Sequence, residues 1–595
     1  MITARLDEGK IRLSFPYDGP LIAEVKAISG SRYCGKPTHD RTLPISLASL
    51  HFLKKHNLCE NAEVLRAFGS LLKLEDRRVE NVARAAATDA SLPDFPFRMP
   101  PMAHQRVGTR LLLDNPVFAI LDEMGTGKSK VSIDAACMLY EAGTIEGVLV
   151  VCPNTVKGNW AHHEWGQLAA HVPERVPVHV QRVDSKDKKR FSVPSHKEGL
   201  EWVVVNYEGL LVASVNKVLH EWLKTRSVMI VLDESDRIKG HKSLRTKAAT
   251  SLGKLAARKV IMTGTPIAKD PLDFYAQFYF LDPNILGHHT FTTFKAHYAK
   301  LEEKIFRHKG VERPVKIITG WNDLDGLEAR VASFSRRILK KECLDLPDKV
   351  YSHREVAMSK EQWQHYEALE ENLITEVEGR SVATPIVLTK LLRLSQIAAG
   401  FLPLAEAGIT DTKHHRFAEN PKVDAAMEFL TDEATGKTIL FCLFHEEIAM
   451  LEERLAQAKI VYRVISGKVK GERRDNAWME FQNDPTVMAI VVQVATGGIG
   501  IPLFAAEHVL YLTNSQSHRD RAQSEDRAHR QGTKHTVTYI DILVTTPDGC
   551  QTTDHVALQN LREKKDVADV VLGDRLKHMM KERKGRRGRG DVPQV

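Results

Sequence analysis

The chain lacks the features of membrane-spanning, secreted and zinc-stabilised proteins. Its 595 residues contain no apolar run of about 18 residues, the length that a membrane-spanning helix needs. The first residues, MITARLDEGKIRLSF, lack the apolar stretch of a secretory signal. The seven cysteines include no CxxC pair, which argues against a disulfide framework and a structural zinc site. We therefore expect a soluble, cytoplasmic protein with no membrane partner.

Excess charge is scarce outside the last residues of the chain. The net charge is +8, and residues 575–589 alone carry eight Lys or Arg side chains against one acid, Glu582. The remainder is nearly neutral, so a nucleic-acid groove must depend on the local placement of charge. We expect residues 571–595 to form a disordered basic tail, which is either a salt-sensitive contact with phosphates or simply a solvated end.

Two series of short, β-branched apolar runs indicate two sheets. VFAIL, GVLVVC, EWVVVN, VMIVLD and KVIMT lie in residues 96–285, and KTILFCLF, KIVYRVI, VMAIVVQV, HVLYLT and VTYIDIL lie in residues 421–570. These runs are too apolar for half-exposed strands, as expected for parallel strands covered by helices on both faces. We predict an α/β fold with two tandem RecA-like lobes, each a doubly wound parallel sheet.

Further segments precede and connect the predicted lobes. Residues 1–95 form a small α/β accessory unit that ends at the proline-rich sequence SLPDFPFRMPP. Residues 286–420 are far longer than a typical loop and contain the charged, helix-favouring stretches FTTFKAHYAKLEEKIF and SKEQWQHYEALEENLITEVEG. We expect helical insertions and the inter-lobe connection in this segment.

A glycine-rich loop, DEMGTGKSK at residues 122–130, lies between a predicted strand and a predicted helix. Gly125 and Gly127 allow backbone N–H groups to turn towards phosphate oxygens. Lys128 is placed to reach the β- and γ-phosphates of a nucleotide, and Ser129 to ligate Mg²⁺. A structural turn beside a surface lysine is the alternative. The residues predicted to bind nucleotide in this loop are Asp122, Gly125, Thr126, Gly127, Lys128, Ser129 and Lys130.

Two adjacent carboxylates, Asp233 and Glu234, end the apolar run VMIVLD. The carboxyl ends of parallel strands meet at one edge of a sheet, so this pair should face the same crevice as the glycine-rich loop. We expect Asp233 to hold the Mg²⁺ shell and Glu234 to polarise the attacking water. An acidic pair in a surface turn is the alternative interpretation.

Arginines recur with helical spacing in RAQSEDRAHRQGTK, residues 521–534. Arg527 and Arg530 follow Gln523 by four and seven positions, a spacing that predicts one shared helix face for the three residues. Such arginines can stabilise charge that develops on a transferred phosphoryl group, an effect of roughly 10³- to 10⁵-fold in rate. We assign Arg527 and Arg530 to catalysis and Gln523 to nucleotide binding. Taken alone, this segment would be read as a solvated charged helix.

The motifs and their order along residues 95–570 resemble those of Swi/Snf-type ATPases within helicase superfamily 2. DEMGTGKS resembles DEMGLGKT of that family, DESD resembles its DEAH box, and QSEDRAHRQG resembles QAEDRAHRIGQ, its motif VI. PMAHQRVG resembles the adenine-reading motif, VVCPNTVKGNWAHHEW motif Ia, MTGTP motif III, and VQVATGGIGIPLFAAEHVLYL motif V. The chain is compact, which suggests a viral or bacterial member, acting in a bacterial cell or a virus-infected host cell.

The resemblance implies further residues and an activity. It implies that Gln105 and Gly500 contribute to nucleotide binding, and that Lys157, Thr265 and Thr496 contact DNA. It also implies ATP and Mg²⁺ as cofactors and a DNA-dependent ATPase that translocates on duplex or branched DNA with little sequence preference, acting as a monomer. A strand-separating helicase is the first alternative, and a nucleotide-switched DNA-binding scaffold with weak hydrolysis is another.

The segment VKAISGSRYCGKPTHDRTLPISLASL faintly resembles the HARP module of annealing helicases, in its Arg-Tyr pair and a later Leu-Pro. In that interpretation Arg32 and Tyr33 pair with and stack on nucleic acid. An unrelated small α/β domain is the alternative.

Overall fold

The computed structural model describes most of the chain, which divides into two compact units, Met1–Leu339 and Lys340–Val595. The described residues are 2–7, 10–28, 31–35, 40–45, 47–58, 62–184, 191–192, 198–267, 270–308, 311–379, 384–403, 414–469, 472–494 and 501–563. The expected basic tail at 571–595 lies outside them. Across the described ranges, every helix is too short or too polar to cross a membrane.

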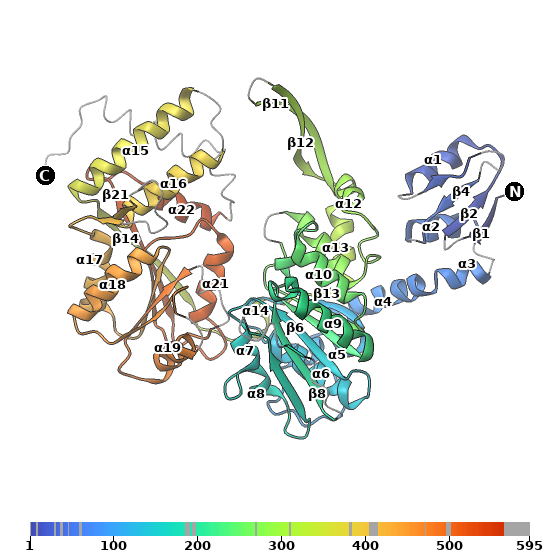
Figure 1. Cartoon of the computed structure of the whole chain (residues 1–595), viewed down its shortest axis with the longest axis horizontal. Helices are drawn as coiled ribbons and strands as arrows, with labels where there is room; N and C mark the ends of the chain where they lie inside the picture. The colour runs from blue at the N-terminus through green and yellow to red at the C-terminus, as the bar shows by residue number, and fades with distance from the viewer. Residues whose placement is uncertain are drawn as a thin grey trace. The chain divides into compact units, whose positions relative to one another are not determined.

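The first unit begins with a small antiparallel sheet and helices, coloured blue in Figure 1. The alternation of β2 places Ile11 and Leu13 in its core, where Val25 and Leu53 also lie fully buried. The strands, in sheet order, are β1 (Thr3–Asp7), β2 (Lys10–Ser14), β4 (Arg41–Leu43) and β3 (Arg32–Tyr33). The helices are α1 (Gly19–Ala27), α2 (Leu47–Lys55), α3 (Ala62–Ala67) and α4 (Gly69–Ala85).

A seven-stranded parallel sheet follows in the same unit and forms lobe 1. In sheet order the strands are β13 (Ser335–Arg336), β5 (Val117–Ile120), β10 (Arg258–Met262), β9 (Val228–Asp233), β6 (Gly147–Cys152), β8 (Leu200–Asn206) and β7 (Val178–Arg182). The helices are α5 (Ala103–Asp114), α6 (Lys128–Glu141), α7 (Lys157–Ala161), α8 (Gln167–His171), α9 (Ala213–Thr225), α10 (Leu244–Gly253), α11 (Phe274–Leu281), α12 (Phe291–Tyr298) and α13 (Leu324–Ala332).

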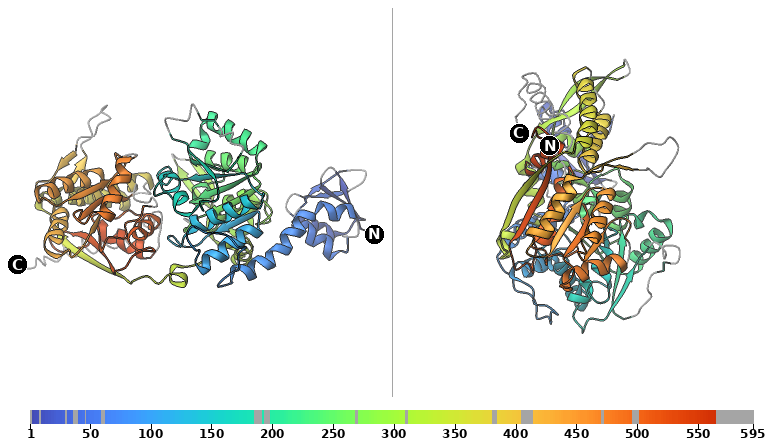
Figure 2. Two further views of the ribbon diagram at one scale, coloured as in Figure 1. Left: turned by 90° about the horizontal axis from the view of Figure 1, so that it is seen from below. Right: turned by 90° about the vertical axis from the view of Figure 1, so that its left-hand side faces the viewer.

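The apolar runs of the sequence form the central strands of lobe 1. Every residue of β6 and β8 is buried, as a parallel sheet with helices on both sides requires, and Figures 1 and 2 show those helices. The five predicted strands are confirmed. The edge strands β7 and β13 were not predicted, because VHVQR alternates with polar residues and Ser335–Arg336 has no apolar character.

The stretch FTTFKAHYAKLEEKIF is helical only in its first half, so the expectation of a continuous helix is wrong. Helix α12 ends at Tyr298, and strand β11 (Ala299–His308) follows and pairs with β12 (Val311–Trp321) in an antiparallel hairpin. Backbone pairing along the hairpin outweighs the helix propensity of Leu, Glu and Lys, which is high but is only a weak preference that tertiary context overrides. The second stretch forms helix α15 (Lys360–Gly379), as expected.

The second unit contains a six-stranded parallel sheet that forms lobe 2 (Figure 1). In sheet order the strands are β14 (Lys349–Ala357), β21 (Val537–Thr545), β20 (His508–Tyr511), β17 (Thr438–Cys442), β19 (Ala489–Gln493) and β18 (Tyr462–Ile465). The helices are α14 (Lys340–Cys343), α15, α16 (Thr384–Ala398), α17 (Pro421–Glu428), α18 (His445–Gln457), α19 (Glu472–Asn483), α21 (His518–Ala528) and α22 (Thr553–Arg562). The strands β15 (Phe401–Pro403) and β16 (His414–Arg416) form a separate hairpin. The predicted fold of two tandem parallel-sheet lobes is therefore confirmed.

Alternate residues of the lobe 2 strands face different helices. Leu440 and Cys442 pack with α17 and α18 in one apolar cluster. On the opposite face the Tyr511 hydroxyl lies 2.6 Å from Ser524 Oγ, and the Tyr539 hydroxyl donates to the carbonyl of Glu525 at 2.9 Å. Helix α21 is thus fixed to the sheet face opposite α17 and α18.

Arg521 anchors α21 to the sheet. Its guanidinium is 3.6 Å from the centre of the Tyr511 ring and pairs with the Asp541 carboxylate on β21, and it also donates to Asn514 at 2.8 Å. Arg521 and Asp541 are both almost fully buried. A buried carboxylate that loses its charged partner is strongly destabilising, since the remaining charge has no compensation.

We expect Arg521→Met to destabilise lobe 2 by about 3–5 kcal/mol. Hydrogen exchange of the β20 and β21 amides in the full chain measures this loss directly. Arg454→Met is the matched control, because Arg454 pairs with Asp424 at 2.7 Å with both side chains about half exposed. An exposed pair contributes about 1 kcal/mol or less. Equal protection of β21 in the two variants would contradict this account of Arg521.

Candidate nucleotide-binding site

Three neighbouring strands of lobe 1 bring the predicted site together. The sheet order is β5, β10, β9, and Ile120, Met262 and Asp233 are register partners across it. The segments that leave these strands at their carboxyl ends are the glycine-rich loop, the MTGTP segment and the acidic pair. Parallel strands of a doubly wound sheet bind ligands at this edge. Residues more than 100 positions apart in sequence therefore meet here.

The loop between β5 and α6 is closed around the Lys128 side chain. The Lys128 ammonium donates to the carbonyl oxygens of Asp122 at 2.9 Å and Glu123 at 3.0 Å. The Thr126 hydroxyl donates to the carbonyl of Glu123 at 2.8 Å. Gly125 and Gly127 have φ of 79° and 90°, a left-handed conformation that side chains other than glycine adopt with strain. These hydrogen bonds and backbone angles thus fix the conformation of the loop at the N-terminus of α6.

Gln105 lies against this loop, where the resemblance had suggested a nucleotide contact. Its amide oxygen accepts from the N–H of Met102 at 3.0 Å, which caps α5, and its amide nitrogen donates to the carbonyl of Thr126 at 3.3 Å. A Cβ at Gly127 would lie 2.3 Å from the Gln105 amide nitrogen. Gly127 is therefore required both by its backbone angle and by the close approach of Gln105.

Asp122 points away from the loop and into lobe 1. Its buried carboxylate forms a two-pronged ion pair with Arg336 of β13 and accepts from the N–H of Ile338 at 3.1 Å. Its carboxylate is therefore fully engaged within the fold, and its remaining link to the loop is the carbonyl that accepts from Lys128. No sequence pattern indicated Arg336, which lies 214 positions away from Asp122.

Lys130 also turns inward from the loop. Its buried ammonium pairs with Asp134 on the next turn of α6 at 2.7 Å and lies 5.5 Å from the centre of the Phe97 ring. Burial raises the pKa of Asp134 to about 6, against the lowering effect of Lys130. The sequence grouped Lys130 with the nucleotide-binding residues, whereas the structure places its charge in a buried pair behind the loop.

The acidic pair lies close to Lys128. Burial and the neighbouring Glu234 carboxylate raise the pKa of Asp233 to about 6, while hydrogen bonding from Trp160 and the charge of Lys128 oppose this rise. Trp160 Nε1 donates to Asp233 Oδ2 at 2.8 Å. A carboxylate with a raised pKa in a cleft beside a lysine is typical of a functional site.

Glu234 occupies a strained backbone position with φ of 53° and ψ of 56°. A non-glycine residue in this region marks a position that the surrounding structure determines. The Thr263 hydroxyl, directly after β10, donates to Glu234 Oε2 at 3.3 Å. Thr263 was not among the predicted site residues, although it lies within the MTGTP motif that the sequence identified.

A buried amide links the acidic segment to the MTGTP segment. Ser235 Oγ donates to Gln277 Oε1 at 2.7 Å, and Gln277 Nε2 donates to the carbonyl of Pro266 at 2.9 Å. Gln277 is fully buried on α11. The two motifs are therefore coupled through one side chain, which no sequence pattern indicated.

The expected arginine face of lobe 2 is only partly helical. Gln523 and Arg527 lie on α21 and are buried, but α21 ends at Ala528. Arg530 follows in a turn where its N–H donates to Thr533 Oγ1 at 3.1 Å, and Thr533 Oγ1 donates to the carbonyl of Ala528 at 2.7 Å. The expectation that Arg530 continues the helix face is wrong, because Thr533 closes the helix end.

The expected DNA-contact residues have different positions. Lys157 is buried, and its ammonium donates to the carbonyl of Val183 at 2.8 Å and to Asp184 Oδ1 at 2.7 Å. The structure therefore places the buried Lys157 charge in an ion pair, and its contact with DNA stays a prediction. Thr265 follows β10, at the same edge as the acidic pair. Thr496 and Gly500 lie outside the described residues.

We expect Arg336→Met to weaken nucleotide binding and to destabilise lobe 1 by about 3–5 kcal/mol, because Asp122 would remain buried without its cation. Arg336→Lys should recover only part of this loss, since a lysine cannot reproduce the two-pronged pair. Chemical unfolding and titration with a fluorescent ADP analogue measure the two effects. Full recovery by Arg336→Lys would show that the planar guanidinium is not needed.

Comparison with known families and proteins bears on this site. Residues 111–399 match the SNF2-related domain, and residues 421–532 match the helicase conserved C-terminal domain. The chain is 24% identical to a Caenorhabditis elegans homolog of the SWI/SNF-related matrix-associated actin-dependent regulator of chromatin subfamily A-like protein 1, over 96% of this chain and 76% of that protein. It is 24% identical to the human DNA annealing helicase and endonuclease ZRANB3, over 69% of this chain and 35% of that protein.

A further relative and a solved structure are similar to this chain. The TATA-binding protein-associated factor mot1 of Schizosaccharomyces pombe is 24% identical over 76% of this chain and 25% of that protein. The Sulfolobus solfataricus SWI2/SNF2 ATPase core in complex with dsDNA is 22% identical, covers 81% of this chain and 95% of its own, and has a TM-score of 0.37. The chain spans only part of several relatives, 25% of mot1 and 35% of ZRANB3. With a SNF2-related domain followed by a helicase C-terminal domain, the chain belongs to the Snf2 family of helicase superfamily 2.

Proposed function

We propose that this chain is an ATP-dependent DNA translocase of the Snf2 type. The observation that carries the proposal is the meeting of Lys128, Asp233 and Glu234 at the carboxyl ends of β5 and β9, the two strands that flank β10, with the pKa of Asp233 raised to about 6. Residues 96–285 and 421–570 would supply most of the two motor lobes. Residues 286–420 would connect them, and they also contribute β13 to lobe 1 and β14 to lobe 2. The chain would act on DNA. It would do so in the cytoplasm and as a monomer.

The residues of lobe 1 fit a nucleoside triphosphate with Mg²⁺. Lys128 presents an ammonium and α6 presents its N-terminal N–H groups, which together favour phosphate oxygens. Ser129, in the first turn of α6, and Asp233 supply oxygen ligands of the kind that Mg²⁺ prefers. The cation, when bound, supplies charge neutralisation at the phosphates. Gln105 would read the base beside the loop.

Glu234 would orient the attacking water and accept its proton. The water oxygen forms a bond to the γ-phosphorus, the bond from that phosphorus to the β–γ bridging oxygen breaks, and ADP and inorganic phosphate leave. Thr263 donates to Glu234 Oε2 at 3.3 Å, which would help to orient the carboxylate towards the water. Arg527 and Arg530 of lobe 2 would stabilise the charge that develops, and Gln523 would support the nucleotide.

DNA is the proposed partner because several relatives are named for work on it: an annealing helicase and endonuclease, and the DNA repair and recombination protein RDH54 of Saccharomyces cerevisiae, 26% identical over 76% of this chain. Thr265 and Thr496 would contact the backbone, which positions the protein without reading sequence. Such contacts suit duplex or branched DNA of any sequence.

The accessory unit, residues 1–95, would contribute to DNA recognition. Tyr33 on β3 is 49% exposed, and the Arg41 guanidinium lies 5.5 Å from its ring centre. Arg32 precedes it on the same strand. An exposed aromatic ring beside cations is a surface on which nucleic-acid bases stack.

We expect DNA-stimulated ATP hydrolysis, and Lys128→Ala to lower kcat by about 10²- to 10³-fold. Glu234→Gln should lower kcat similarly while nucleotide binding remains, because the amide cannot accept the proton. Lys254→Ala, an exposed lysine at the end of α10, is the control and should behave as wild type. Steady-state hydrolysis titrated with single-stranded, duplex and forked DNA measures these rates.

Two outcomes would reject the proposal in favour of other functions. Release of a displaced strand from forked DNA at the rate of ATP turnover would identify a strand-separating helicase. Tight nucleotide-dependent DNA binding without turnover in the wild-type chain would identify a nucleotide-switched scaffold.

A further inference from the structure

The segment between α4 and α5 is attached to lobe 1 at both ends. At its start, α4 is docked through Asn81, whose amide donates to Asn115 Oδ1 and to the carbonyl of Ser333, each at 3.0 Å, and through an ion pair between Arg84 and Asp114. At its end, Met102 caps α5 through Gln105. We call residues 89–102, between these attachments, the strap.

The strap contacts the first turn of α6, the helix that begins at Lys128, and is linked to the last residue of that helix through Arg175. Phe97 lies 5.5 Å from the Lys130 ammonium, on the first turn of that helix. Phe95 is 93% buried and lies 5.3 Å from the Arg175 guanidinium, which donates to both carboxylate oxygens of Glu141, the last residue of α6. The two strap rings contact each other edge to face at 5.0 Å. The strap is thus linked to both ends of α6, directly at the first turn and through Arg175 at the last residue.

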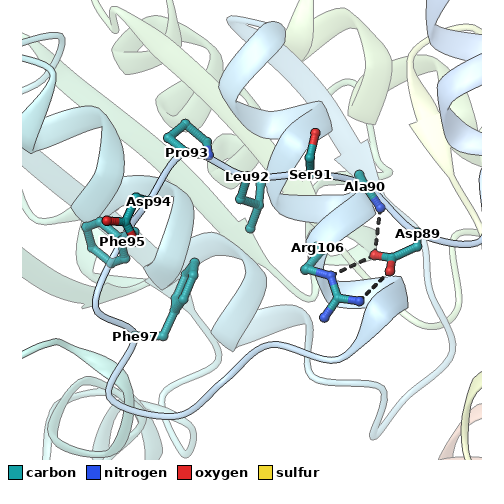
Figure 3. Close-up of a pocket in the computed structure, with 9 residues that line it drawn as sticks. All are labelled: Asp89, Ala90, Ser91, Leu92, Pro93, Asp94, Phe95, Phe97 and Arg106. Atoms are coloured by element: carbon teal, nitrogen blue, oxygen red, sulfur yellow. Dashed lines mark hydrogen bonds and ion pairs between the residues drawn. The ribbon is translucent and has the colours of Figure 1, made fainter.

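The strap also contacts α5, next to the glutamine that touches the nucleotide loop. The Arg106 guanidinium donates to both oxygens of Asp89, at 2.7 Å through Nε, and to the carbonyl of Pro101 at 3.0 Å. Figure 3 shows Asp89 and Arg106 bonded at one end of a cavity of about 580 Å³, with Phe95 and Phe97 at the other. Arg106 directly follows Gln105 on α5.

We propose that the strap positions the nucleotide-binding loop by tying α5 to α6, with Phe97 and Asp89 as positioning residues for nucleotide binding. This inference rests on the proposed ATP site. Neither residue would touch the nucleotide. Phe97 acts through Lys130, two residues after Lys128, and Asp89 acts through Arg106, one residue after Gln105.

The fit between α5 and the loop is tight enough for such positioning to matter. Gln105 Nε2 is 3.3 Å from the carbonyl of Thr126, and it occupies the place where a Cβ on Gly127 would lie. A small displacement of α5 relative to α6 therefore changes how Gln105 meets the loop. The Lys130 charge depends on its surroundings too, since its ammonium pairs with Asp134 and lies over the face of the Phe97 ring.

Variants of Phe97 separate positioning from simple packing. A cation on an aromatic ring face is stabilised by the ring quadrupole, which leucine lacks and tyrosine keeps. We expect Phe97→Leu to raise both the Kd for a fluorescent ADP analogue and the KM for ATP by about three- to tenfold, with kcat at saturating ATP within about twofold of wild type. Phe97→Tyr should retain wild-type constants. Leu92→Ala, which alters another side chain that lines the same pocket, is the control.

Asp89→Asn provides a second test that does not threaten folding, because Asp89 is half exposed. It should raise the ADP-analogue Kd by about two- to threefold through the loss of the Arg106 pair. Unchanged Kd values in both Phe97→Leu and Asp89→Asn would overturn the inference, as would equal losses in Phe97→Leu and Phe97→Tyr. A wild-type chain that neither binds the ADP analogue nor hydrolyses ATP would instead overturn the proposed function.

Discussion

The alignment of β5, β10 and β9 at their carboxyl ends is the constraint on which the candidate site depends. In a parallel sheet these ends lie at one edge, so Ile120, Met262 and Asp233 form one row across the sheet. The segments that follow these three residues must therefore lie close together. The middle strand supplies Thr263, which holds Glu234. A site assembled in this way needs no long-range loop, because the hydrogen bonds of the sheet already fix the spacing of its functional groups.

Around this edge the charged side chains fall into two groups. Asp122 forms a buried ion pair with Arg336, and Lys130 forms a buried ion pair with Asp134. These two pairs attach the loop to the interior of lobe 1. Lys128 is partly accessible and bonded only to backbone carbonyls in the described loop, which are weaker partners than a carboxylate. An incoming phosphate can therefore replace the partners of Lys128 without breaking a buried ion pair, while its neighbours stay in place.

The sequence predicted the central strands and Lys128, Asp233 and Glu234, because each of these residues directly follows or begins an element with a strong local pattern. Arg336 and Gln277 could not be predicted in this way. They reach the site from a two-residue edge strand and from the buried face of α11, and the contacts that matter are made over 214 and 42 positions of sequence. A local sequence pattern can identify the residues that end a strand. It cannot identify residues such as Arg336 and Gln277, which the fold brings to the site from distant segments.

The predictions that failed share one physical cause. The spacing of Arg530 suits a helix, but Thr533 bonds the last turn and ends it at Ala528. The composition of residues 299–308 suits a helix too, but pairing with β12 makes it a strand. Lys130 follows the loop motif, but Asp134 and Phe97 draw its charge inward. In each case a partner outside the pattern decided the outcome. One of the two partners of Lys130, Phe97, belongs to the strap, so the buried position of Lys130 is a link between the strap and the nucleotide loop.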